Sequence, residues 1–155
     1  MKRLFVYLVL FVQLAGLVAL YAYHASDFGA HFLLRTRPVD PRDFLRGDYV
    51  ILNYEISGLP KEYEGRWKSG QELQVRLRPD GEFWVIDRVS ERRERDGAPW
   101  LRATLDGGRL KYGIESYYVA EGRGNPPGSI TVEIGIRGEG NAQLRQLFSD
   151  GAPWR

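Results

Sequence analysis

The sequence predicts a mainly β protein, in which an N-terminal transmembrane helix precedes a small antiparallel β-sandwich or partly open β-barrel. Two patterns predict this fold class. The stretch from Leu4 to Tyr23 carries no charged residue, whereas the rest of the chain alternates apolar and polar residues with the period of two typical of strands. Glycine-rich turns separate the alternating stretches. We therefore divide the 155-residue chain into an anchor, residues 1–27, and one domain, residues 28–155.

The anchor helix is expected over residues 4–23. At 1.5 Å per residue a helix of this length spans about 30 Å, which matches the hydrocarbon core of a bilayer. Lys2 and Arg3 precede it, and Gln13 is its one strongly polar residue. A cleaved signal peptide is the alternative, but the apolar run is longer than signal peptides require and Ala22–Ala25 fits a cleavage site poorly. We expect an uncleaved signal-anchor with the domain on the extracytoplasmic, periplasmic side of the cell membrane.

Composition excludes several function classes. The 22 Lys and Arg against 20 Asp and Glu leave a formal net charge of +2, so no nucleic-acid partner is expected. There is no cysteine and only two histidines, so we expect no metal site and no cofactor. The run Glu91–Asp96 alternates in sign and is interpreted as a solvated hairpin tip.

Alternation also predicts the individual strands of the domain. Residues 49–56 are expected to form one strand with Leu52, Tyr54 and Ile56 on the same face. Further strands are expected at residues 73–78, 83–89, 100–105, 109–112, 117–120 and 130–136, with turns at Pro79–Gly81 and Asp106–Gly108. Residues 143–149 fit a helix or a strand, of which we favour the strand, and Pro60–Arg66 is expected to form one short helical turn.

One pentapeptide, Asp-Gly-Ala-Pro-Trp, occurs twice, at residues 96–100 and 150–154. A duplicated hairpin edge that presents tryptophan is one interpretation. The flanking residues do not match, however, as they would in a true repeat. We therefore favour independent turn chemistry, in which Asp-Gly makes a turn and Pro starts a strand.

The most specific motif is the string Gly47-Asp48-Tyr49-Val50-Ile51-Leu52-Asn53-Tyr54. With the leading segment Thr36–Arg46 and a second block from Lys111 to Gly122, it resembles the GDYXXLXY family of envelope proteins. The resemblance covers the anchor and most of the domain. It implies a small membrane-anchored protein, often encoded beside multi-pass membrane proteins, and it implies no particular activity.

Every residue type in the motif has a structural role available to it. Gly47 permits a tight entry turn, and Asp48 can bond nearby backbone amides to fix that turn. Tyr49 then faces opposite Leu52 and Tyr54, which are natural core residues. A well-specified turn and central strand is the interpretation that we favour.

The alternative is a binding site. It requires the polar residues of the motif and of the second block to converge on one cleft: Asp48, Tyr54, Tyr112, Glu115 and Glu121. With Gly47, Tyr49 and Leu52 these are the candidate binding residues, and no catalytic residue can be named.

Two hydrolytic chemistries remain open. An anchor followed by Gly-Asp-Tyr-Val is similar to the start of type I signal peptidases, but Val39 stands where that family has its serine nucleophile. A glycan hydrolase needs paired carboxylates, for which Glu115 and Glu121 are candidates. We expect a non-catalytic accessory or binding domain for a multi-pass membrane partner, with an envelope hydrolase as the alternative.

Overall fold

A computed structural model describes residues 2–25, 30–37, 49–118 and 126–154, without the side chains of residues 2–6, 22–25 and 49. Its elements, in chain order, are α1 (Lys2–Ala25), β1 (His31–Arg35), β2 (Tyr49–Ile51), η1 (Glu55–Ser57), η2 (Lys61–Tyr63), β3 (Glu72–Asp80), β4 (Phe83–Ser90), β5 (Trp100–Asp106), β6 (Arg109–Lys111), β7 (Ser116–Tyr118), β8 (Ile130–Arg137), β9 (Asn141–Ser149) and β10 (Ala152–Trp154). The two η elements are single 3₁₀ turns.

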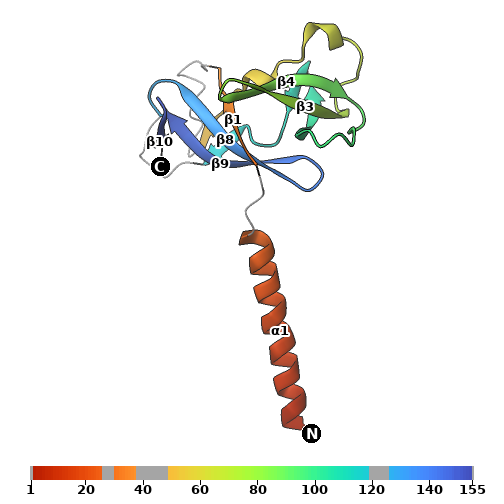
Figure 1. The fold of residues 1–155 in the computed structure, drawn as a ribbon, viewed down its shortest axis with the longest axis vertical. Helices are drawn as coiled ribbons and strands as arrows, with labels where there is room; N and C mark the ends of the chain where they lie inside the picture. The colour runs from red at the N-terminus through yellow and green to blue at the C-terminus, as the bar shows by residue number, and fades with distance from the viewer. Residues whose placement is uncertain (1, 26–29, 38–48, 119–125, 155) are drawn as a thin grey trace.

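The helix α1 is continuous over the whole segment predicted to be helical and stands clear of the strands in Figure 1. Between Tyr7 and Tyr21 it carries eleven large apolar side chains that are 40–75% exposed. Among the described residues, no helix is found that is long and apolar enough to cross a membrane.

The strands form antiparallel sheets, which confirms the mainly β, antiparallel prediction (Figure 1). One four-stranded sheet has the order β1-β8-β9-β10, and a second has the order β4-β3-β5-β6. The strands β2 and β7, far apart in the sequence, make a two-stranded sheet. All three sheets contribute side chains to one hydrophobic cluster, in which Leu34, Val50, Val75 and Val132 are fully buried.

Of the two hairpin turns predicted from glycine, one is as expected and the other begins later than predicted. The turn between β5 and β6 is formed by Gly107 and Gly108, whose φ angles of 55° and 78° suit a type I′ turn. Pro79 and Asp80, predicted to lie in a turn, instead continue β3 and pair with β4. Proline is tolerated here because β5 pairs with β3 only as far as Arg76, so the missing amide leaves no ladder bond unmade on that side.

The predicted strand over residues 49–56 is also too long. It ends at Ile51, and Glu55–Ser57 form a 3₁₀ turn closed by a bond from the Ser57 amide to the Tyr54 carbonyl oxygen (3.1 Å). The predicted burial is nevertheless confirmed, since Leu52, Tyr54 and Ile56 are at most 4% exposed. Burial here follows from the core side chains and does not require the ladder to continue.

The remaining predictions largely agree with the structure. Residues 143–149 lie within the strand β9, and the short helical turn lies at Lys61–Tyr63. The strand expected at 117–120 is β7, as far as Tyr118. Residues 119 and 120 lie outside the described part of the chain.

Candidate functional site

The motif segment and the second block lie side by side in the fold. Val50 in β2 pairs with Tyr117 in β7, and the Leu52 amide continues the contact by donating to the Glu115 carbonyl oxygen (2.7 Å). About sixty residues separate the two segments in the sequence, so this pairing is a long-range contact that the two motif blocks make with each other.

Two buried tyrosines cross-link these segments reciprocally. The Tyr54 hydroxyl donates to the Ile114 carbonyl oxygen, and the Tyr112 hydroxyl donates to the Ile56 carbonyl oxygen, both at 2.7 Å. Each tyrosine thus bonds the residue two positions beyond the other tyrosine. Because a buried hydroxyl without a partner is costly, the two bonds satisfy both rings and fix the register of the two segments.

Both phenols are held in the neutral form. Burial is the main cause that raises the pKa of Tyr54 and of Tyr112 well above the ordinary value, and the nearby Glu115 carboxylate raises both further. Neither hydroxyl reaches solvent, since the residues are 0% and 6% exposed. These tyrosines therefore serve as hydrogen-bond donors within the core, and they are poorly placed to ionise for chemistry.

The Glu115 carboxylate caps the turn that precedes β7. It accepts the backbone amides of Tyr112 (2.5 Å) and Gly113 (3.0 Å), the latter in the left-handed region with φ of 80°. Two backbone donors on one carboxylate satisfy it locally. Glu115 thus has a structural function in ordering the second block.

The structure brings together three of the five residues proposed to converge, namely Tyr54, Tyr112 and Glu115. They meet in the interior and in a turn, and none of them is among the residues that line the surface hollows described below. Leu52 is buried in the same core, as the structural interpretation predicts. Gly47, Asp48 and Glu121, and the side chain of Tyr49, lie outside the described residues, as does Val39.

Two open hollows lie on the surface of the domain, away from the motif. The Phe148 hollow, about 330 Å³, is lined by Leu33, Phe83 and Phe148 with two carboxylates, Glu82 and Asp150. The Trp84 groove, about 400 Å³, is lined mainly by Phe32, Trp84, Pro99, Trp100 and Ile136, with Arg93 as its charged residue and Ala30 beside them.

Histidine and carboxylate groups do not cluster in the described part of the chain. No three or more His, Cys, Asp or Glu residues there are arranged to hold a metal ion. His31 contacts the Glu133 carboxylate across β1 and β8, which is an ordinary cross-strand pair on the sheet surface.

Sequence reasoning missed the crossed tyrosine bonds and the Trp84 groove. A faint signal for the first was present, because both tyrosines stand in the pattern Tyr-x-Ile, at residues 54–56 and 112–114. The groove had no signal of its own. Its lining comes from five separate stretches of the chain, and alternation alone cannot say which strands become neighbours.

The fold and the site define a small antiparallel β domain, preceded by an apolar helix, whose two signature segments are joined in its interior. The chain belongs to the GDYXXLXY family: the family model described as GDYXXLXY protein matches residues 11–147. This range runs from within α1 to within β9 and includes both joined segments, so the resemblance noted in the sequence is confirmed. No curated protein and no solved structure matches the chain.

Proposed function

We propose that the protein is a single-pass, membrane-anchored domain on the extracytoplasmic side, without catalytic activity of its own, which binds or supports a multi-pass membrane partner. The observation that carries the proposal is the surface of α1. The family assignment is compatible with this function and does not by itself supply it.

The apolar side chains of α1 surround the helix. Residues 8–12 are all large, apolar and at least 40% exposed, and at 100° per residue five consecutive positions cover the whole circumference. A helix that is apolar on every side requires apolar surroundings, either a protein core or a lipid bilayer. In the sequence the uncharged stretch extends from Leu4 to Tyr23, beyond the fifteen residues whose side chains the structure describes.

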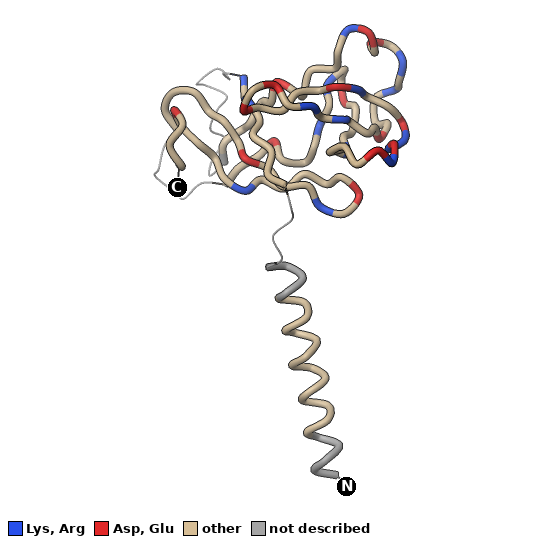
Figure 2. The backbone as a smooth tube through the Cα atoms, viewed as in Figure 1, with Lys and Arg blue, Asp and Glu red and all other residues tan. Residues whose placement is uncertain are grey.

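The flanking charge supports the proposed orientation. Lys2 and Arg3 adjoin the N-terminal end of the apolar stretch, where the positive-inside tendency favours the cytoplasm. Lys, Arg, Asp and Glu residues are distributed along the strands and loops of the domain that follows, whereas the described side chains of α1 include none (Figure 2), as expected for a water-facing body after an apolar helix. We infer that the domain occupies the periplasmic side.

A polar residue supports a helical partner. Gln13 lies near the middle of α1 and is exposed, with Gly16 one turn away on the same side. A side-chain amide within a bilayer favours a hydrogen bond to another helix, and a neighbouring glycine allows that helix to approach closely. A multi-pass protein can offer such a helix.

The test is affinity capture of the full-length protein from its native membrane after crosslinking. We expect one multi-pass protein to be recovered in stoichiometric amount. The Q13L variant should stay in the membrane but recover about threefold to tenfold less partner, because one interhelical hydrogen bond is lost. F11L is the matched control, since it introduces the same residue about 160° away around the helix.

Three outcomes decide the matter. Equal loss in Q13L and F11L would place the contact elsewhere than on the Gln13 side. Release of the protein from membranes by alkaline washing would contradict the anchor. Recovery of the protein alone and monodisperse would remove the accessory function and bring forward a screen for hydrolysis of peptide or envelope glycan.

A further inference from the structure

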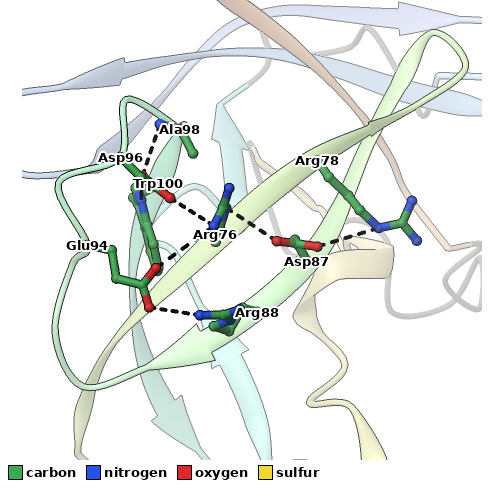
Figure 3. A network of polar contacts seen from close by, with 8 residues as sticks. All are labelled: Arg76, Arg78, Asp87, Arg88, Glu94, Asp96, Ala98 and Trp100. Atoms are coloured by element: carbon green, nitrogen blue, oxygen red, sulfur yellow. Dashed lines mark hydrogen bonds and ion pairs between the residues drawn. The ribbon is translucent and has the colours of Figure 1, made fainter.

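The charged run Glu91–Asp96 lies in the loop between β4 and β5. In the fold its acidic and its basic residues make different contacts. All three of its acids bind groups of the domain. Glu91 accepts the Trp67 indole N–H (3.0 Å), Glu94 pairs with Arg88 (2.8 Å) and Asp96 pairs with Arg76 (2.8 Å). Figure 3 shows the last two contacts around Arg76, which also pairs with Asp87.

The three arginines of the same run do not bind groups of the domain as the acids do. Arg92, Arg93 and Arg95 are exposed, and none forms an ion pair with another described residue. Glu94 and Asp96 are thus paired with arginines of the strands, and Glu91 accepts hydrogen bonds from the neutral side chains of Trp67 and Gln71. The run is formally neutral, but its three arginines are the groups that it presents to solvent without an acidic partner among the described residues.

Arg93 borders the Trp84 groove. The groove is lined by apolar groups, with Trp84 packing edge-on against Phe32 at a centroid distance of 4.9 Å. Among the described residues that line it, none is acidic and Arg93 alone is charged. An apolar cleft with a cation at its border complements an amphiphile that has an apolar body and an anionic head.

The groove also lies near the end of the anchor. Ala30, which lines it, is five residues beyond Ala25, the last residue of α1. Five Cα–Cα steps of at most about 3.6 Å span no more than about 18 Å. With α1 in the bilayer, as proposed above, this part of the groove is within reach of the lipid headgroups.

We propose that the Trp84 groove binds an anionic phospholipid of the membrane that holds α1, with the headgroup phosphate at Arg93 and the glycerol and first acyl carbons against Trp84 and Phe32. This inference rests on the anchoring part of the proposed function. A free phosphate would match Arg93 alone, and an apolar peptide would match the groove floor alone. The amphiphile matches both.

The test uses the full chain in nanodiscs and the quenching of tryptophan fluorescence by brominated lipid. All four tryptophans belong to the domain and α1 has none, so lipid around the helix does not contribute directly. Two discs are compared that contain the same amounts of phosphatidylglycerol and phosphatidylcholine and the same mole fraction of brominated lipid. We expect stronger quenching when the phosphatidylglycerol carries the bromine than when the phosphatidylcholine carries it. W84F should lose most of this difference.

Two variants test the charge. R93Q should weaken the preference for the anionic lipid about tenfold, because a charge-assisted hydrogen bond is removed from an exposed side chain. A30E, which adds a carboxylate at an exposed lining position, should weaken it as well. R66Q is the matched control, since it removes an exposed arginine from a different loop. Unchanged melting temperatures would show that all three variants fold.

Several results would overturn the proposal. Two of them are equal quenching by the two brominated lipids and an unchanged lipid preference in R93Q. A third is complete loss of the selective quenching when inorganic phosphate is added at constant ionic strength. The fourth is quenching that falls as the protein concentration rises, which would indicate that a second copy of the chain covers the groove. Co-elution of the chain with the disc is measured first. A chain that does not co-elute contradicts the anchor, whereas one that co-elutes without selective quenching contradicts the groove proposal alone.

Discussion

Two copies of one pentapeptide, Asp-Gly-Ala-Pro-Trp, occupy different places in this fold and make different contacts. In the first copy the Asp96 carboxylate accepts two donors close to it in the sequence, the Ala98 amide (3.1 Å) and the Trp100 indole N–H (3.2 Å), and it also pairs with Arg76 on β3 (2.8 Å). In the second, Asp150 lies in a two-residue hairpin turn and accepts the Ser129 amide (2.8 Å) from another part of the chain.

The tryptophans differ as well. Trp100 is 1% exposed at the start of β5 and is covered by its own loop, with the Asp96 carboxylate against its indole nitrogen (Figure 3). Trp154 ends β10 at a sheet edge, half-buried, with its ring centroid 6.2 Å from that of Tyr117. The two copies are not one hairpin edge built twice.

The difference teaches where local sequence stops deciding structure. Both copies share a glycine with positive φ, 75° at Gly97 and 79° at Gly151, which is the part that Asp-Gly chemistry dictates. Loop length decides the rest. Nine residues between β4 and β5 let the first aspartate bind groups of its own loop, whereas in the two-residue turn between β9 and β10 the second aspartate binds the neighbouring segment at Ser129.

The largest expected effect separates the two tryptophans. W100A should lower the free energy of unfolding by about 3–5 kcal/mol, because it leaves a cavity and removes the partner of Asp96. W154A should cost only about 1 kcal/mol, because its ring is already half in water. Urea denaturation of the full chain in detergent measures both.

A far-ultraviolet circular dichroism spectrum like that of the parent protein is the control for each variant. Equal losses in the two variants would mean that Trp154 is covered in solution by something beyond the described residues. That result would erase the contrast between the copies.

The same distinction explains how much of the fold the sequence predicted. The sequence located most of the strands, but it predicted no strand over β1 and gave no bounds for β10. Alternation also predicted that Leu52, Tyr54 and Ile56 are buried. The prediction failed at Glu55–Ser57, where the backbone leaves the strand pairing although the side chains stay buried. It also failed at Pro79, where β3 continues beyond the end of its pairing with β5 and still pairs with β4. Period and burial are local properties, but pairing depends on neighbours.

The candidate site was predicted less completely for the same reason. The motif identified Tyr54 and the second block identified Tyr112, yet their crossed bonds to carbonyl oxygens depend on the pairing of β2 with β7. The ion pairs of the run Glu91–Asp96 depend on Arg76 and Arg88, which lie on β3 and β4. Residue type suggests a donor or an acceptor, and only the fold supplies its partner.

A smaller contrast is expected between the aspartates. D96A should lower the melting temperature more than D150A, because it leaves the Trp100 indole N–H without its acceptor and removes one of the carboxylates that pair with Arg76, whereas D150A removes a single contact to a backbone amide. Differential scanning calorimetry of the two variants at neutral pH measures this. A greater loss in D150A would reverse the proposed order of the copies.

Acid should remove the effect of D96A. The hydrogen bond from Trp100, assisted by the Ala98 amide and by Arg76, holds the pKa of Asp96 below its ordinary value of 3.8. A lowered pKa in the folded state stabilises the protein above that ordinary value and ceases to do so as the pH falls through the folded-state pKa. The melting-temperature difference between the parent protein and D96A should therefore be full at pH 7 and shrink toward pH 2. A difference that is constant with pH would show that the carboxylate charge is not what stabilises the loop.

The smallest expected contrast is between the glycines. At both Gly97 and Gly151 φ is positive and a Cβ would meet nothing within 4 Å, so backbone strain is the only cost of adding one. G97A and G151A should each lose about 1 kcal/mol of unfolding free energy, and the two losses should agree. Parallel urea titrations, with both variants compared to the same parent, measure them.

Equal losses would locate the difference between the copies in their aspartates and tryptophans. The positive φ of the glycine, which the pentapeptide imposes by itself, would then have the same energetic weight in a nine-residue loop and in a two-residue hairpin. Clearly unequal losses would instead mean that one loop relaxes around the new methyl group, and that the shared φ is not a fixed requirement of the sequence.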